Sequence, residues 1–437
     1  MVSRPAMTVP SPAQNRTGLA PTESPQSGRR EQAQPRPQFD LYEQIFHPRI
    51  FRFWPCLIGI MVGFLVCCVA GVVASRVNFY RDFHRFHQYI SPATLYYPTV
   101  SQMVSIVESK AKPDQTIVII GGNSIFNGIG QQLSDLWSDN LAQQLGEKYA
   151  VFNFAQPGAL PFEGGYWTAE SLLKRGKKVI FATVAVPTQA GTPDGEKIYG
   201  YMYWDARAKS MLLDSPKRDA AIERRLKISD EPEQNRVAES KLCGQLDSLL
   251  HFRDLWSAVG YLKFFTVWTQ PTAQNPFKPR YKYGDWQPYP VAVSKRFCSA
   301  EELNVMRGAA NGFFDITPTT WKAKAEAWHN LGVEMNDLIP NHYKHNCLVI
   351  IAGHPPTYLN RLDEGSKGRV RESEQRSKQT WITAGYHSDD VGMRFQDEDY
   401  RDCLHLVASG GKKMATLVAA NIKSVSKELH YDDGGDQ

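Results

Sequence analysis

Hydrophobic residues after residue 115 first appear in short, uninterrupted runs of β-branched and aromatic side chains. Such runs are typical of parallel strands that are buried on both faces. Three of them follow one another at residues 116–120, 151–154 and 179–186. We therefore predict three strands in this part of the chain.

Between these runs the apolar positions take the wider spacing of a helix. Leucines mark a first helix within residues 136–145, with Ser134 as its predicted N-cap and Gly146 as its end. Residues 163–174 predict a second helix, which Gly176 terminates. The resulting β-α-β-α-β order predicts a parallel sheet with helices on both faces, and ligands in such sheets bind at the carboxyl ends of the strands.

The alternation then stops over residues 189–345, which are dense in Trp, Tyr and Pro and include helical segments at 242–265 and 299–306. We interpret this stretch as a lid inserted between two strands. A strand at 347–352 resumes the sheet, and an amphipathic helix at 412–429 closes the chain. The core is thus predicted to be one α/β domain with a large insertion.

An unbroken apolar segment precedes the α/β region. Residues 54–74 carry no charge, and as a helix they extend about 31 Å, enough to cross a bilayer. The segment is longer than the core of a cleaved signal peptide and begins after 53 residues, which favours an uncleaved signal anchor. It is apolar around its whole circumference, which disfavours a buried core helix.

The flanking sequence predicts the orientation of this span. Residues 1–40 hold 7 of the 27 prolines and almost no large apolar side chains, so they are predicted to be a disordered arm, with a proline-rich ligand as the alternative. Arginines flank the span on both sides, and the arm adds five more, which places the N-terminus in the cytoplasm. The rest of the chain then lies in the periplasm or at the cell surface. The flanking arginines are Arg49, Arg52, Arg76, Arg81 and Arg85.

These elements divide the chain into seven segments. In order they are the arm, the span, a stalk with the start of the external domain, the first part of the core, the lid, the second part of the core and a short tail. Their predicted bounds are 1–53, 54–75, 76–113, 114–188, 189–345, 346–429 and 430–437.

Composition narrows the classes of function. The net charge is only +5 and no basic stripe is present, which excludes a nucleic-acid binder. Neither a Cys-x-x-Cys pair nor clustered Cys and His residues suggests a metal, and no cofactor is expected. Four cysteines of the soluble part allow two disulfides in three pairings, which leaves the pairing open. They are Cys243, Cys298, Cys347 and Cys403.

Two short motifs are candidates for chemistry. Ser124 follows two glycines and Asn123 directly after the first strand, a strand-to-helix turn that exposes a nucleophile beside backbone N–H groups. Asp402 and His405 stand three residues apart before the last helix, where a carboxylate can orient an imidazole that accepts a proton from a serine. Taken alone, the first motif is also typical of an ordinary turn and the second of a surface turn, and these are the alternative interpretations. Together they point to one active site.

With Gly128 and the segment Asn153-Phe154-Ala155-Gln156-Pro157-Gly158, these motifs resemble the blocks of the SGNH (GDSL-type) hydrolase superfamily. The resemblance covers about residues 114–187 and 346–428. It implies a three-layer α/β/α sandwich with Ser124 as nucleophile, His405 as general base and Asp402 as its partner. It further implies that the backbone N–H groups of Ser124 and Gly158 bind the oxyanion, with Asn123 and Asn153 beside them.

The chain departs from the family at two blocks. Position 123 is Asn where the family commonly has Asp, and Thr188 and Gln189 stand in the region where the family has its third-block Gly-x-Asn. A missing oxyanion donor costs about 3–4 kcal/mol at comparable sites, so Thr188 or Gln189 is the candidate replacement. His354 follows the fourth strand and is either a pocket residue or a turn histidine.

Membrane-anchored relatives in this superfamily include envelope-glycan O-acyltransferases, and the predicted topology is similar to theirs. The resemblance therefore implies serine-dependent acyl transfer, most often of acetyl, or ester hydrolysis on an exported glycan. A transferase also implies a multi-spanning membrane acyltransferase as partner. The alternative is a catalytically degenerate envelope protein that binds glycan or scaffolds a membrane complex, because fold alone does not decide activity.

Overall fold

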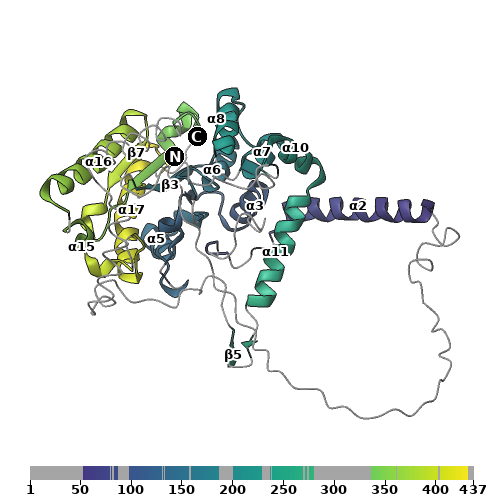
Figure 1. Ribbon diagram of the computed structural model, residues 1–437, viewed down its shortest axis with the longest axis horizontal. Coiled ribbons are helices and arrows are strands. Elements are labelled where there is room, and N and C mark those ends of the chain that lie inside the picture. Colours follow the sequence, from purple (N-terminus) through teal and green to yellow (C-terminus); the bar gives the residue numbers. More distant parts are fainter. Residues whose placement is uncertain are drawn as a thin grey trace, which may run out of the picture. The chain divides into compact units, whose positions relative to one another are not determined.

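A computed structural model describes the chain from residue 53 to residue 431, with gaps (Figure 1). The chain divides into two compact units, residues 1–59 and 60–437, and of the first only the start of one helix is described. The predicted arm and tail thus lie almost wholly outside the described residues. The gaps are 79, 81–82, 87–97, 130, 132, 157–158, 187–199, 229–236, 238, 269–270, 273–274, 280–335, 361 and 402–403.

Helix α2 (Phe53–Arg76) contains the predicted span. It is long and apolar enough to cross a membrane, as an anchor or as a signal sequence, and nearly all of its most apolar stretch is exposed. A core helix of a soluble protein would be mostly buried, so the exposed surface contradicts that alternative.

The centre of the second unit is a five-stranded sheet in the order β2-β1-β3-β6-β7, and every neighbouring pair is parallel. The four predicted strands are confirmed to within two residues at each end. The fifth, β7, is absent from the prediction because its residues, His-Ser-Asp-Asp, have no apolar side chain. The strands are β1 (Thr116–Ile120), β2 (Tyr149–Asn153), β3 (Val179–Ala185), β6 (Cys347–Ile351) and β7 (His387–Asp390).

Alternate side chains of each strand enter separate cores on the two faces of the sheet. In β1, Ile117 and Ile119 join one core, and Val118 and Ile120 join the other. Helices α3 (Val100–Lys110), α6 (Gly165–Lys174) and α7 (Gly200–Ala208) supply the first core, and α5 (Trp137–Leu145) and α17 (Ala408–Glu428) supply the second. The prediction of helices on both faces is confirmed.

Helix α5 differs from its prediction at its start. Its N-cap is Leu136, which makes no side-chain cap hydrogen bond, and Ser134 lies in a preceding 3-10 turn where it donates to Asp135. The predicted cap was wrong because the turn already uses the serine. Gly146 does end the helix, with φ +79° and its N–H donating to Ala142 O.

The described part of the insertion is largely helical. The predicted helix at 242–265 is two helices, broken at His251 with φ 56°, and residues 299–306 lie outside the described residues. Helices α7 and α10 pack on each other, and the buried Trp204 lies between them. The remaining elements are α8 (Pro216–Ile228), α10 (Lys241–Leu250), α11 (Phe252–Trp268), β4 (Pro271–Thr272) and β5 (Asn275–Pro279).

After β6 the chain forms helices that the hydrophobic pattern does not reveal. Helix α16 (Glu364–Thr383) is charged over most of its surface and buries only a narrow stripe, including Val370 and Trp381. Its N-cap is Asp363, whose carboxylate accepts from the N–H of Ser366. The other short helices are α15 (Pro356–Leu359) and the 3-10 turns Leu133–Asp135, Asn341–Asn346, Gly392–Arg394 and Asp397–Asp399.

Two of the four soluble cysteines are described, and both are free. Cys347 is buried in β6 and Cys243 is partly exposed in α10. Each of the three two-disulfide pairings needs both of these cysteines, so none of the three is formed; Cys298 and Cys403 lie outside the described residues.

The contact between α5 and α17 supplies a test of the second core. Leu141 is fully buried on α5, so Leu141→Ala is expected to lower the free energy of unfolding by about 2–5 kcal/mol. Gln143→Ala on the exposed side of the same helix is expected to change it by less than about 0.5 kcal/mol. Equal unfolding midpoints for the two variants in urea would contradict the assigned burial.

Candidate active site

The candidate nucleophile lies at a tight turn after β1. Gly121 and Gly122 lead into Asn123, which is the N-cap of the one-turn helix α4 (Ser124–Asn127). The Asn123 side-chain Oδ1 accepts from the N–H of Ile125 at 3.0 Å. Asn123 therefore fixes the start of the helix, and Ser124 is its first residue.

Only glycines fit this turn. A Cβ on Gly121 would lie 2.5 Å from the ring of Phe181, and a Cβ on Gly122 would lie 2.8 Å from Thr183 Oγ1. Gly122 also has φ +90°, which other residues rarely adopt. The turn thus packs directly against β3 and brings Ser124 to the carboxyl end of the sheet.

This position is the topological switch point of the sheet. The chain leaves β1 for β2 on one side and then crosses to β3 on the other, and sheets of this kind bind ligands beyond the carboxyl ends of the strands at such a point. Ser124 follows β1 directly and is partly exposed.

His405 meets the serine at this end of the sheet. Its Nε2 lies 2.9 Å from Ser124 Oγ, although the two residues are 281 positions apart in the chain. A base within about 2.6–3.2 Å of a hydroxyl is close enough to take its proton. His405 is partly exposed, like the serine.

A closed loop holds the histidine. The N–H of Arg401 donates to His405 O at 2.7 Å, and Tyr400 and Leu406 form an antiparallel bridge just outside that bond. The buried Gln131 donates from Nε2 to Leu406 O at 3.5 Å, a long bond that joins this loop to the segment after α4. The loop is therefore tied both to itself and to the serine's side of the site.

Two buried asparagines anchor helix α4 to the end of β2. Asn153 donates from Nδ2 to Phe126 O at 2.9 Å and accepts the N–H of Ala155 at Oδ1 at 3.1 Å. Asn127 donates to Ala155 O at 3.0 Å. Both side-chain groups of Asn153 bond to backbone, so in this structure it positions the helix that carries the serine.

Arg85 closes the other end of α4 and was not identified from the sequence, where it counted only as a charge flanking the span. Its side chain is fully buried, and its guanidinium donates to the carbonyls of Asn127, Gly128 and Gln131. A cation at the carbonyl end of a helix is electrostatically favourable. The only sequence signal was an arginine among aromatic residues, Phe83 and Phe86, which are themselves buried.

Four predicted site residues cannot be placed beside this pair. Asp402, the predicted partner of His405, lies outside the described residues. The same applies to the predicted oxyanion residues Gly158, Thr188 and Gln189.

His354 is buried and lines a separate cavity of about 190 Å³ beyond the ends of β6 and β7. Neither Ser124 nor His405 belongs to its lining, which includes Lys367, Arg371, Met393, Phe395 and Gln396. His354 therefore lies apart from the serine–histidine contact.

Glu374 is buried near this cavity, against Gly353, and neither of its carboxylate oxygens has a hydrogen-bond partner among the described residues. Burial raises the pKa of Glu374 to about 8, and the neighbouring Asp390 adds to this rise. The group is therefore mostly protonated at neutral pH.

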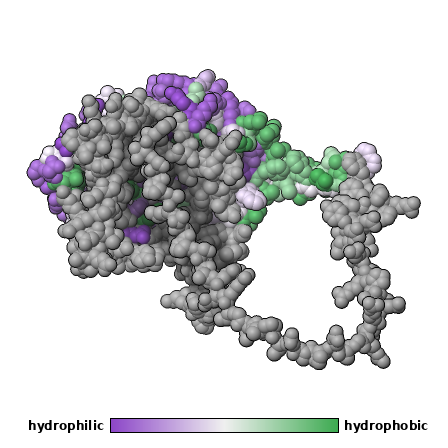
Figure 2. Space-filling model, in the orientation of Figure 1, coloured by the Kyte–Doolittle hydropathy of each residue, from purple (hydrophilic) through white to green (hydrophobic). Residues whose placement is uncertain are grey.

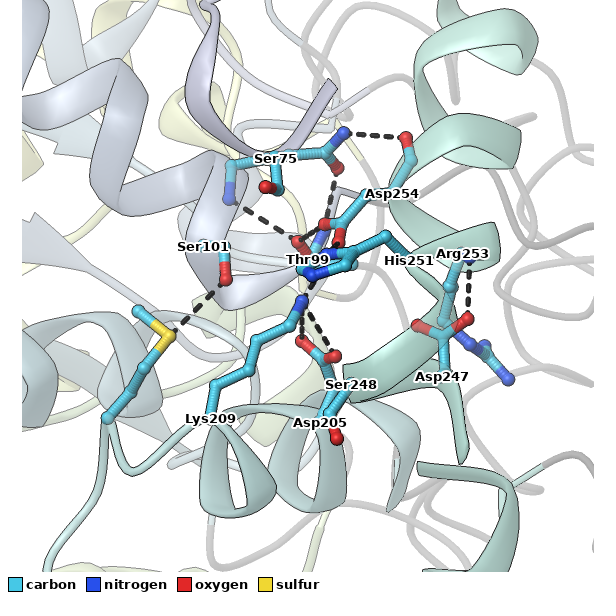
Figure 3. A network of polar contacts seen from close by, with 12 residues as sticks. Ser75, Thr99, Ser101, Asp205, Lys209, Asp247, Ser248, His251, Arg253 and Asp254 are labelled. Atoms are coloured by element: carbon cyan, nitrogen blue, oxygen red, sulfur yellow. Dashed lines mark hydrogen bonds and ion pairs between the residues drawn. The ribbon is translucent and has the colours of Figure 1, made fainter. Parts of the chain in front are cut away.

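A second polar cluster joins the insertion to the end of α2 (Figure 3). The Lys209 ammonium lies 2.8 Å from carboxylate oxygens of both Asp205 and Asp254. Asp254 also accepts from the Thr99 hydroxyl at 2.5 Å and lies 2.8 Å from His251 Nδ1. The cluster is a chain of paired charges that links α7 and α11 to the start of α3.

Burial sets the protonation of this cluster. It raises the pKa of Asp205 to about 7 despite the opposing effect of Lys209. Burial also acts to raise the pKa of Asp254, but hydrogen bonds from His251, Lys209 and Thr99 outweigh it and hold that pKa below its ordinary value. Asp254 is thus the ionised centre of the cluster.

Comparison with known proteins finds no family model that matches the chain and no curated protein with a matching sequence. The structure itself shows a parallel five-stranded α/β sheet, an apolar helix long enough to cross a membrane, and the contact between Ser124 and His405.

The hydrogen bonds from Arg85 to three backbone carbonyls can be tested for their contribution to stability. Arg85→Met leaves three carbonyls without their charged donor, so we expect the free energy of unfolding to fall by about 3 kcal/mol or more. Arg175→Met removes a half-exposed ion pair with Glu108 and is expected to cost less than about 1 kcal/mol. Similar losses for both variants in chemical denaturation would argue against this role of Arg85.

The raised pKa of Glu374 predicts a pH dependence of stability. The folded state binds its proton up to about pH 8, whereas the unfolded carboxyl releases it near its ordinary value of 4.5. Stability is therefore expected to fall as pH rises through this window, by at most about 1.4 kcal/mol per pH unit. Glu374→Gln should flatten this dependence, whereas Glu372→Gln on the exposed side of α16 should not. Unfolding midpoints from pH 5 to pH 9 measure the difference, and parallel curves for wild type and Glu374→Gln would refute it.

Proposed function

We propose that this protein is a membrane-anchored, serine-dependent acyl-transfer enzyme of the SGNH type. In this proposal Ser124 is the nucleophile, His405 the general base and Asp402 the carboxylate that orients it. The observation that carries the proposal is the 2.9 Å contact between Ser124 Oγ and His405 Nε2. It joins two segments that the sequence motifs had singled out separately.

The surroundings of the pair agree with this role. The serine lies at the switch point of a parallel sheet, where ligands of such folds bind. Its N–H belongs to the first turn of α4, where backbone N–H groups have no intrahelical partner and can bind an anion. Asn123 caps the start of this helix and Arg85 binds the carbonyls at its end, so the hydroxyl is presented on a fixed support.

The chemistry proceeds in two balanced steps. Ser124 Oγ attacks the acyl carbon of an ester while His405 Nε2 takes the hydroxyl proton, and the carbonyl oxygen becomes an oxyanion. His405 then gives this proton to the leaving alcohol, and an acyl–Ser124 ester remains. In the second step an acceptor hydroxyl attacks the acyl carbon and loses its proton to His405, which gives this proton to Ser124 Oγ as the acyl–serine bond breaks.

The acceptor decides between transfer and hydrolysis. We propose a hydroxyl of an exported or cell-surface glycan as acceptor and acetyl as the acyl group, because the anchored topology is similar to that of envelope-glycan O-acyltransferases. With α2 as an uncleaved anchor and the N-terminus in the cytoplasm, the sheet lies outside the cytoplasm. A multi-spanning acyltransferase in the same membrane would then supply the acyl group.

Release of acetate from an activated aryl acetate by the purified full-length protein tests the two roles. Ser124→Ala and His405→Ala are each expected to lower the rate about 10³-fold or more, because neither residue acts without the other. Ser134→Ala, at an exposed serine ten positions away, is the matched control and should keep the wild-type rate. Undiminished acetate release by Ser124→Ala would refute the proposed nucleophile. A wild type no faster than Ser124→Ala would favour the non-catalytic envelope protein.

A further inference from the structure

Helices α10 and α11 of the insertion expose a continuous set of apolar side chains. On α10, Leu242, Leu246 and Leu249 are 65%, 50% and 77% exposed, and their spacing of four and three residues places them on one face. A soluble helix normally turns such a face toward the core. Here it faces outward.

Helix α11 continues the apolar surface after the break at His251. Trp256, Val259 and Leu262 are about half exposed and recur every third residue along the helix. Figure 2 shows hydrophobic residues extending from α2 onto the adjoining insertion helices. We call the six side chains on α10 and α11 the insertion surface.

The corner between α10 and α11 lies directly against α2. The ring of Phe252 packs edge-on against that of Phe64, with centroids 5.3 Å apart. Gly71 lies so close to His251 that a Cβ on it would be 2.2 Å from the His251 carbonyl oxygen. The corner therefore contacts α2 at two points, Phe64 and Gly71, which are two turns apart on that helix.

Buried hydrogen bonds fix that arrangement. The Gln102 side-chain amide donates to Ala74 O at 3.2 Å and to Asp254 O at 2.8 Å, so one side chain bridges the last turns of α2 and the first turn of α11. Asp254 is held in turn by Thr99 and Lys209 (Figure 3). The insertion surface is thus rigidly placed relative to α2.

The position of this contact along α2 determines whether the insertion surface lies in lipid or in water. Phe64 is twelve residues before Arg76, which corresponds to about 18 Å along a helix and to the middle of the hydrocarbon layer if α2 spans it. Phe252 touches Phe64, so the corner of α10 and α11 must lie within that layer. The large apolar side chains of this corner are exposed, together with Lys241 and Gln245 of α10. Lys209 pairs with the buried carboxylates of Asp205 and Asp254, as a charge at such a depth requires.

From these observations we infer that the insertion surface is a second membrane-binding element, seated among the lipid acyl chains beside α2. The inference rests on the proposal that α2 spans the membrane. Lipid is the occupant that the structure favours, because the surface is continuous with the lipid-facing side of the anchor. An aromatic residue such as Trp256 is common at the boundary of the hydrocarbon layer. The catalytic domain would therefore be held at a fixed height above the bilayer.

Cysteine accessibility in the full-length protein tests the inference. Leu246→Cys and Leu249→Cys are placed in lipid nanodiscs of phosphatidylcholine and phosphatidylglycerol and treated with a charged, membrane-impermeant maleimide. Gln375→Cys on the exposed side of α16 is the aqueous control, and Val62→Cys within α2 is the control for the span. Mass spectrometry of the labelled peptides separates the new cysteines from the seven native ones.

We expect Leu246→Cys and Leu249→Cys to react at least about tenfold more slowly than Gln375→Cys, as Val62→Cys does, because lipid excludes the charged reagent. If Val62→Cys is protected but the two insertion cysteines react as fast as Gln375→Cys, the surface faces water or a protein partner, and the inference is overturned while the span stands. If Val62→Cys itself reacts at the rate of Gln375→Cys, the span and the inference fail together.

Discussion

The hydrogen bond between Ser124 and His405 is the interaction on which the functional account depends. It joins residues 281 positions apart, so it exists only because the fold returns the chain to the same edge of the sheet. Packing of α17 against α5 makes that return possible, since α5 follows the serine and α17 follows the histidine. The second hydrophobic core therefore also aligns the serine with the histidine.

The site is rigid because the side chains of three residues form hydrogen bonds with backbone groups of the helix that carries the serine and of the residues after it. Asn123 caps the start of α4, Asn153 ties its middle to β2, and Arg85 binds the carbonyls at its end. Preorganised groups cost little reorganisation when charge develops in a reaction. On the insertion side, the buried cluster around Asp254 plays a comparable structural part by joining α11 to α3 and the end of α2.

Much of this was predictable from hydrophobic pattern and motif. The four apolar strands, the end of α5 at Gly146 and the meeting of Ser124 with His405 follow from period, turn chemistry and the convergence of parallel strands at one edge. Strand β7 did not follow, because an edge strand of polar residues carries no apolar signal. Arg85 did not either, because burial of an arginine depends on carbonyls distant in sequence. The Ser134 cap was wrong because local hydrogen bonding to Asp135 competes with capping.

The central claim of the proposed function is that Ser124 becomes transiently acylated with His405 as its base. The most direct measurement is peptide mapping by mass spectrometry after the full-length protein is mixed with an activated acetyl ester and quenched in acid. The account predicts acetyl on the peptide that contains Ser124, and its absence when His405 is replaced by alanine. Acetyl distributed over other residues, or an unmodified Ser124 while ester is consumed, would contradict it.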